Sequence, residues 1–270
     1  MRVMTFNIFE GGDSPLNNRI YRRDIIARII RDARPDILAL QECTNWGDAD
    51  QKILHEFEEQ VGMTALLAVT DGFPVGVLVR PEYGILHADA LTDGFWHGIL
   101  DVVVTDANNE TTRFINAHLH PNDPQKKGEE VGRLLGRYHE GGRTVILGDM
   151  NSLSHLDNLD ISNLSEETRA RHVFGGKIDY RVSRSMEEAG FLDVYALLHD
   201  GDPVPTIPTA AAEVSNFTPV RLDYIYVTSD LRNTLVSIEV VRTADSDTAS
   251  DHYPLLLDIA DGPINGQALE

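Results

Sequence analysis

The feature that most constrains this fold is a series of short, apolar, strand-like runs that recur along the whole chain. They read RVMTFN, DILALQ, VGVLV, ILDVVVT, RFINAHL, TVILGD, LDYIYV, VSIEVV and PLLLDI. Between residues 75 and 118 several runs follow one another without room for a helix, unlike the βαβ alternation of a doubly wound sheet. We therefore predict mainly antiparallel strands, arranged as two sheets packed face to face.

Helical periodicity interrupts these runs at about residues 19–33, 49–61, 125–140 and 183–189. No internal repeat, low-complexity tract or Pro/Gly-rich linker divides the 270 residues. We predict one mixed α/β domain with helices packed on the outer sides of both sheets. Two long polar segments, 153–182 and 199–219, are natural positions for active-site loops.

The charge balance limits the choice of partners. Asp and Glu number 43 against 23 Lys and Arg, which gives a formal net charge of −20. This field repels nucleic acid and anionic membranes at long range unless a local cationic patch opposes it. The clearest basic cluster is NNRIYRRDIIARIIRDAR, whose isoleucines form a helical stripe while its arginines fall mostly elsewhere. We expect those arginines on the solvated face of an amphipathic helix.

The cellular location is constrained mainly by what the sequence lacks. The first residues enter a strand-like pattern directly, and no later apolar run approaches the length of a membrane span. The lone Cys43 cannot form an internal disulfide, and we expect it to be a buried thiol. We therefore expect a cytoplasmic protein with no obligate protein partner, and a secreted protein without disulfides stays open.

The stretch VILGDMNS, residues 145–152, points to chemistry at a strand end. Gly148 lets the backbone bend there or a ligand approach closely. Asp149 and Asn151 follow, and residues two apart on an extended chain project to the same side. Asp and Asn also favour turns and helix caps, so this pair alone is equally consistent with a turn.

Other predicted strands also end in polar side chains. These are Asn7, Gln41, Glu42, His118, His120, Asp223, Asp251 and His252. Each has an ordinary structural explanation, but together they indicate a site, because one end of a two-sheet sandwich could bring them together. Carboxylate and amide oxygens suit a hard divalent ion such as Mg²⁺ or Mn²⁺. We predict metal-assisted phosphoester hydrolysis, with a cation on Glu42 and with Asp149 orienting or deprotonating water.

The ordered motifs TFN, LQE, AHLHP, GDMN, RLDYIYV and SDH resemble those of the endonuclease/exonuclease/phosphatase superfamily. This family includes deoxyribonuclease-like enzymes, abasic-site endonucleases, neutral sphingomyelinases and inositol polyphosphate 5-phosphatases. Each motif is short, and their order along the chain carries the resemblance. It implies that residues 1–270 form a single domain of this family. The implied fold is a four-layer α/β/β/α sandwich with two mainly antiparallel mixed sheets.

The resemblance also implies roles for individual residues. Glu42 resembles the principal Mg²⁺ ligand, with Mn²⁺ able to substitute. Asp149 resembles the residue that acts on the water, and His252, oriented by Asp223, resembles a base or transition-state stabiliser. The implied catalytic residues are His118, Asp149, Asn151, Asp223 and His252. The implied metal ligands are Asn7, Glu42 and Asp251, and the amide of Asn151 is implied to hold the phosphoryl group. We also predict Asn7 and His120 as substrate contacts, and a surface position at the rim stays open for His120.

Several alternatives bear on the substrate and the chemistry. Zinc on His118 and His120 is disfavoured, because HLHPND lacks the adjacent Asp-His of binuclear zinc hydrolases. His97 and His155 are expected at the surface. The first polar segment carries a thin cationic track, and the second almost no basic residue. The track consists of Arg169, Arg171, His172 and Lys177.

We predict a phosphodiesterase whose phosphoester substrate is nucleic acid, a nucleotide or another small phosphodiester. A phosphomonoesterase or phospholipid-headgroup hydrolase of the same family stays open. A catalytically silent binding protein on the same fold is the alternative from another functional class. Such a protein would be expected to have lost ligand positions, and this chain keeps every position that the resemblance names.

Overall fold

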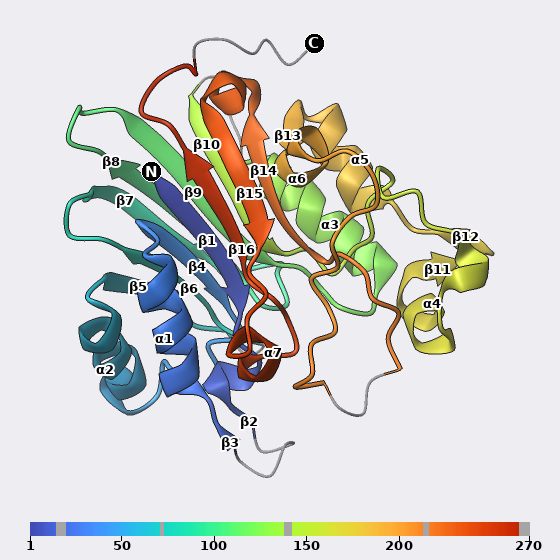
Figure 1. Cartoon of the computed structure of the whole chain (residues 1–270), viewed down its shortest axis with the longest axis horizontal. Coiled ribbons are helices and arrows are strands. Elements are labelled where there is room, and N and C mark those ends of the chain that lie inside the picture. Colours follow the sequence, from blue (N-terminus) through green and yellow to red (C-terminus); the bar gives the residue numbers. More distant parts are fainter. Residues whose placement is uncertain (15–19, 71–72, 138–141, 213–215, 265–270) are drawn as a thin grey trace.

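The computed structural model describes residues 1–14, 20–70, 73–137, 142–212 and 216–264, and it contains two six-stranded sheets (Figure 1). The first sheet consists of β1 (Arg2–Asn7), β4 (Ile37–Gln41), β5 (Thr64–Ala68), β6 (Val75–Val79), β15 (Leu235–Val240) and β16 (Leu255–Ile259). The second consists of β7 (Gly84–Leu91), β8 (Ile99–Thr105), β9 (Thr111–His118), β10 (Arg143–Asp149), β13 (Phe191–Asp193) and β14 (Asp223–Thr228).

The two sheets have the same kind of strand order. The first runs β15-β16-β1-β4-β6-β5, and the second runs β13-β14-β10-β9-β8-β7. Each contains one parallel pair, β1 with β4 and β9 with β10, and its other neighbours are antiparallel. Both sheets are therefore mixed and mainly antiparallel, as predicted.

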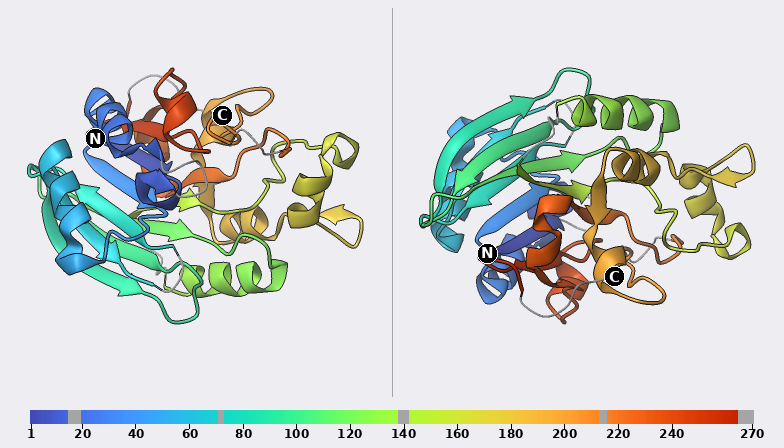
Figure 2. Two further views of the ribbon diagram at one scale, coloured as in Figure 1. Left: turned by 90° about the horizontal axis from the view of Figure 1, so that it is seen from below. Right: turned by 90° about the horizontal axis from the view of Figure 1, so that it is seen from above.

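Helices cover the outer face of each sheet. The first sheet is covered by α1 (Arg23–Ala33), α2 (Lys52–Val61) and the short α7 (Ser246–Ala249). The second is covered by α3 (Pro124–Leu135) and α5 (Arg181–Glu188). Figure 2 shows α1 and α3 on opposite sides of the paired sheets. The predicted four-layer α/β/β/α sandwich is confirmed. Among the described residues, no helix has the length and hydropathy of a transmembrane span.

The remaining elements lie at the edges of the sandwich. They are η1 (Glu10–Gly12), η2 (Ala49–Gln51), η3 (Ile161–Asn163), η4 (Ser229–Thr234), α4 (Glu166–His172), α6 (Val194–Leu198) and the hairpins β2 (Asp13–Ser14) with β3 (Ile20–Tyr21) and β11 (Val173–Phe174) with β12 (Lys177–Ile178). The segment predicted as a loop at 153–182 thus contains η3, α4 and a hairpin. The helix predicted at 125–140 ends at Leu135, and residues 138–140 lie outside the described residues.

Every predicted strand is present. In the two large sheets β5, β7 and β13 were not predicted, and all three are edge strands. The two-residue strands β2, β3, β11 and β12 were not predicted either. The side chains of β7 are mostly exposed on both faces, so its sequence GILHADAL lacks the alternation of a half-buried strand. Exposure at an edge therefore removed the pattern on which the prediction depended.

Gly148 has a structural reason that differs from the one predicted. Its φ angle is 135°, and an added Cβ would lie 2.0 Å from the carbonyl oxygen of Ala117 on β9. The close approach is therefore between two neighbouring strands, not between the backbone and a ligand.

Candidate active site

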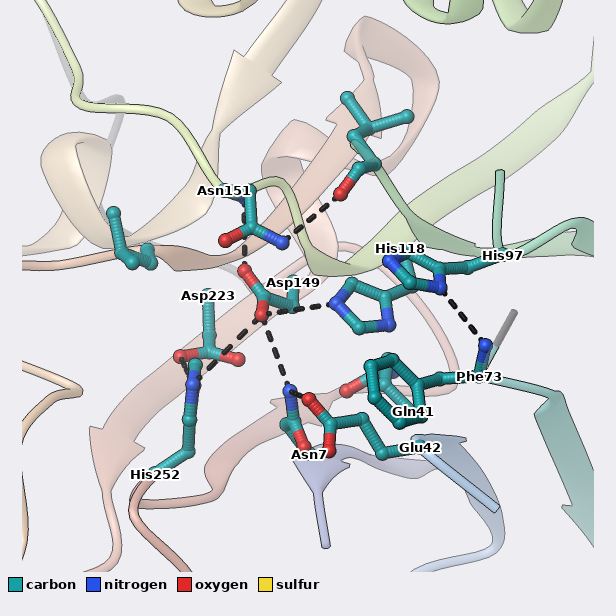
Figure 3. Close-up of polar contacts among 12 residues, drawn as sticks. Asn7, Gln41, Glu42, Phe73, His97, His118, Asp149, Asn151, Asp223 and His252 are labelled. Carbon is teal, nitrogen blue, oxygen red and sulfur yellow. Dashed lines mark hydrogen bonds and ion pairs between the residues drawn. The ribbon is translucent and has the colours of Figure 1, made fainter. Parts of the chain in front are cut away.

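Strand alternation explains why polar side chains gather at one end of the space between the sheets. Side chains two or four residues apart on a strand share a face. In four strands an apolar residue of the central core shares its face with a polar residue near the strand end. These pairs are Val3 with Asn7, Phe114 with His118, Leu147 with Asp149, and Ile225 with Asp223. The parallel and antiparallel registers place these strand ends at the same edge (Figure 3).

Asp149 is the hub of this cluster and is almost fully buried. Its Oδ2 accepts a hydrogen bond from Nδ2 of Asn7 at 3.2 Å and lies 3.4 Å from Nε2 of His118. Nε2 of His252 lies 3.8 Å from the same oxygen. Burial alone would raise the pKa of Asp149, but His252 and His118 outweigh it and hold that pKa well below its usual range. Asp149 is therefore an anion held between two imidazoles.

The pKa values of His118 and His252 are raised, in the opposite direction to that of Asp149. Burial alone would lower the pKa of both imidazoles. The hydrogen bond and charge of Asp149 raise the pKa of His118, and the charges of Asp223 and Asp149 raise that of His252 well above its ordinary value. The cluster thus favours two imidazolium donors around one carboxylate.

Glu42 lies immediately after β4 with a left-handed φ of 61°. One carboxylate oxygen accepts a hydrogen bond from Nδ2 of Asn7 at 3.2 Å, and the other accepts one from the backbone N–H of Glu10 at 2.9 Å. Burial raises the pKa of Glu42, and the nearby Asp251 raises it further. Two repelling carboxylates on a partly buried surface are a donor set that a hard divalent cation would satisfy.

Asn7 turns its amide nitrogen towards the carboxylates of Glu42 and Asp149. Its oxygen accepts a hydrogen bond from the backbone N–H of Phe9 at 3.1 Å. In this arrangement Asn7 links two carboxylates instead of offering its oxygen to a cation.

A second group of metal-binding side chains lies close by. Ligand atoms of Asp149, Asp223 and His252 all lie within 4.8 Å of one another. However, Nδ1 of His252 already lies 2.8 Å from Oδ2 of Asp223. A cation bound there would compete with this hydrogen bond.

Asn151 is held by hydrogen bonds on several sides. It has a left-handed φ of 47°, and its backbone N–H donates to Oδ1 of Asp149 at 2.8 Å. Its side-chain nitrogen donates to the carbonyl of Leu119 at 2.9 Å, and its own carbonyl accepts a hydrogen bond from the buried ammonium of Lys127. Because β10 ends at Asp149, Asn151 is placed by a turn and not by strand alternation. Sequence reasoning missed Lys127, because nothing in PQKKGEE distinguishes it from its exposed neighbour.

His97 is buried, so its predicted surface position is wrong. Its ring stacks on that of His118, with ring centroids 4.0 Å apart and planes 15° apart. Its Nδ1 accepts a hydrogen bond from the backbone N–H of Phe73 at 2.9 Å (Figure 3). The predicted surface position of His155 is also inexact, because this residue is half-buried and bonds to Ser183 and Glu187.

His120 lies at the rim of the site and organises the loop before α3. Its Nδ1 accepts hydrogen bonds from the backbone N–H groups of Asn122 and Asp123, at 3.2 and 3.0 Å. The ring of Trp96 lies 5.3 Å away and is half-exposed, and the ammonium of Lys126 lies 5.4 Å from the Trp96 centroid. The rim therefore presents an aromatic face next to a cation.

Two other expectations about polar residues change. Gln41 donates to Asn116 at 2.8 Å and to Thr5 at 3.0 Å, so it connects the two sheets beneath the site. Arg22 was predicted on a solvated helix face but is 2 % exposed. Its guanidinium donates to the carbonyl of Phe9 at 2.9 Å, close to Asp251 and Glu42.

The cationic track predicted in residues 153–182 is only partly exposed. Arg169 and Lys177 are exposed and Arg171 is half-buried, but His172 is 1 % exposed. Lys177 lines a groove of about 780 Å³ together with Arg181 and Arg184 of α5. Asp160 and Asp179 line the same groove and offset part of its positive charge.

Comparison with known proteins gives a family match and several similar folds. The profile of the Endonuclease/Exonuclease/phosphatase family matches residues 4–252. A functionally unknown conserved protein from Enterococcus faecalis V583 superposes with a TM-score of 0.72 at 16% identity, over 96% of this chain and 99% of that one. An AP endonuclease from Archaeoglobus fulgidus superposes with a TM-score of 0.70 at 18% identity, over 96% of this chain and 99% of that one.

A third similar structure is that of D. rerio TDP2 complexed with single strand DNA product. It gives a TM-score of 0.68 at 16% identity and covers 95% of this chain and 97% of that one. Identities this low show a shared fold and leave the substrate open. No curated protein sequence matches this chain.

Proposed function

This chain belongs to the endonuclease/exonuclease/phosphatase family, and from this premise we propose that it is a divalent-metal-dependent phosphodiesterase. The family match confirms the resemblance found in the motifs, and the family fold supports a phosphoester hydrolase. The observation that carries the proposal is the position of Asp149, a buried anion between His118 and His252 and linked through Asn7 to the carboxylate of Glu42.

The metal site is proposed at Glu42 and Asp251. Oxygen ligands and a partly buried, mutually repelling carboxylate pair fit Mg²⁺, with Mn²⁺ as a substitute. When bound, such an ion would polarise a phosphoryl oxygen and neutralise developing negative charge. Asn7 positions Glu42 relative to Asp149, since its amide donates to both carboxylates.

The remaining residues act on the water and on the phosphoryl group. Asp149, which its surroundings hold ionised, orients the attacking water by accepting a hydrogen bond from it. His118 donates through Nδ1, which is buried and has no hydrogen-bond partner among the described residues. His252, held by Asp223, stabilises the transition state as a second donor, and the amide of Asn151 positions the phosphoryl group.

The substrate proposed is a phosphodiester that carries a nucleobase. Trp96 offers a half-exposed ring for base stacking beside His120, and Lys126 adds a cation for a neighbouring phosphate. The similar proteins named above include an AP endonuclease and a protein with bound single-stranded DNA. The net charge of −20 opposes long polyanions, which favours a nucleotide or a short strand.

The test compares hydrolysis of bis(p-nitrophenyl) phosphate and p-nitrophenyl phosphate with Mg²⁺, Mn²⁺, Zn²⁺ or EDTA. We expect diester cleavage with Mg²⁺ or Mn²⁺, loss of that cleavage in EDTA, and little monoester cleavage. Glu42→Gln should lose at least about 100-fold in turnover and weaken Mg²⁺ binding in calorimetry, while the protein stays folded. Asp149→Ala should lower turnover by a similar factor.

Glu58→Gln is a matched control. Glu58 lies on α2, away from the cluster, and its carboxylate accepts a hydrogen bond from the backbone N–H of Ala65 on β5. This variant should keep wild-type turnover. Preferred monoester cleavage would replace the proposal by a phosphatase. Turnover of neither compound, together with no Mg²⁺ binding, would favour a silent binding protein.

A further inference from the structure

His97 is a buried histidine for which the mechanism above has no role. It lies in the loop between β7 and β8 and is 1 % exposed. Its ring stacks on the rings of Phe73 and His118, with centroids 5.2 and 4.0 Å away. These two ring contacts and the hydrogen bond from the backbone N–H of Phe73 leave the side chain little freedom to reorient, so the direction of its ring nitrogens is fixed.

The hydrogen bond from Phe73 determines the protonation of this ring. A backbone N–H is always a donor, so Nδ1 of His97 must accept and carries no proton. A neutral imidazole then has its single proton on Nε2. Burial and the neighbouring His118 lower the pKa of His97 to about 2, which agrees with a ring that stays neutral. His97 therefore presents a permanent N–H donor at Nε2.

That donor is buried without a hydrogen-bond partner among the described residues. Leaving a buried donor unsatisfied is unfavourable, so such a group requires an explanation. In Figure 3 this nitrogen lies on the side of the ring away from Phe73, towards the Asp149 and Asn151 end of the cluster. Nδ1 of the stacked His118 is also unpartnered within the described chain. Two adjacent imidazoles thus each hold one unused nitrogen.

We infer that His97 is a substrate-contacting residue that donates a hydrogen bond from Nε2 to a non-bridging oxygen of the substrate phosphate. This inference rests on the proposed function, and it adds a neutral donor beside the charged one of His118. A neutral donor can hold the phosphate oxygen without exchanging a proton with it. Donors that are fixed before charge develops lower the barrier, because they need no reorientation during the reaction.

Three substitutions separate the donor from the structural role. In His97→Asn the side-chain amide reaches the place of Nδ1 and can still accept from Phe73, but it cannot reach the place of Nε2. In His97→Gln the amide nitrogen reaches the place of Nε2. His97→Phe keeps an aromatic ring on His118 without any N–H group. Melting temperature and circular dichroism should accompany each variant.

The expected result is a kcat for diester hydrolysis that falls about 100-fold in His97→Asn and His97→Phe. His97→Gln should stay within about tenfold of the wild type. A ranking in which His97→Asn retains more activity than His97→Gln would overturn the inference and leave His97 as a support for Phe73. His199→Gln is the matched control, because the ring of His199 hydrogen-bonds to the carbonyl of Ile238 outside the cluster. This substitution should leave kcat unchanged.

A measurement without turnover separates this inference from the proposed function. In ¹⁵N-histidine-labelled protein, inorganic phosphate added in the presence of Mg²⁺ should shift the His97 Nε2–H signal, and Mg²⁺ alone should not. The signal is assigned by its absence in His97→Asn. No shift on phosphate saturation would overturn the inference. A clear shift in a protein that hydrolyses neither nitrophenyl ester would support the donor while the proposed function fails.

Discussion

Asp223 holds His252 through a hydrogen bond of 2.8 Å between its Oδ2 and Nδ1 of the ring. The two residues lie 29 positions apart, at the start of β14 and just before β16. Both are buried, and the opposite ring nitrogen of His252 lies 3.8 Å from Asp149. The pair therefore fixes the orientation of an imidazole whose other end faces the proposed reacting group.

We expect Asp223→Asn to lower kcat about 100-fold and to change KM by less than about threefold. Orienting and charging an imidazole matters chiefly in the transition state, so the loss should fall on kcat. Steady-state kinetics with a soluble diester would show it. An effect on KM alone would indicate that Asp223 acts on substrate binding.

Asp157→Asn provides the comparison for this prediction. Asp157 is another buried aspartate with a short contact to a cation, 2.7 Å from the guanidinium of Arg221. Its loss should lower the melting temperature without a comparable loss of kcat. If both variants lost turnover equally, the effect of Asp223→Asn would be a general effect of a disrupted buried pair.

Sequence patterns predicted the layers and the gathering of polar side chains at one edge, because both follow from strand alternation. An apolar run that faces a core, such as Val145 and Leu147, also fixes the direction of Asp149. Asn7, His118 and Asp223 lie near the ends of predicted strands, at the same edge as Asp149. Exposed edge strands such as β7 lack that alternation, and they were missed.

His97 and Lys127 could not be predicted in the same way. One lies in a loop and the other on a helix, and each reaches the cluster by a contact that no local pattern records. An isolated histidine or lysine reads as a surface residue. Only the packing of β9, α3 and the loop before β8 buries these two side chains.

Gly148 is the position where we expect the fold to be most sensitive. An alanine there would place its Cβ 2.0 Å from the carbonyl of Ala117, and the φ of 135° is itself strained for any other residue. We expect Gly148→Ala to lower the free energy of unfolding by more than about 3 kcal/mol in urea denaturation.

Gly132 is the matched control for this prediction, because it lies inside helix α3 and an added Cβ would meet no atom within 4 Å. Gly132→Ala should raise the free energy of unfolding by up to about 1 kcal/mol. A Gly148→Ala protein as stable as the wild type would mean that β9 and β10 can separate without loss.

Lys127 should make stability depend on pH. Burial lowers the pKa of its ammonium from 10.5 to about 8 in the folded protein. Between these values the unfolded chain binds more protons than the folded one, so this residue makes the free energy of unfolding rise with pH. Below pH 8 the buried charge costs at most about 3 kcal/mol, and that cost is relieved as pH rises towards 10.5.

Lys127→Met removes this contribution, so the stability of the variant relative to the wild type should be highest below pH 8. It should then fall steadily between pH 8 and 10.5, because only the wild type gains from the loss of a buried charge. Urea denaturation of both proteins at several pH values measures this difference. Lys126→Met, which removes an exposed ammonium one residue away, is the control for the loss of a lysine at this end of α3. A constant or rising difference for Lys127→Met would show that the Lys127 ammonium is well solvated or fully compensated where it meets Asn151.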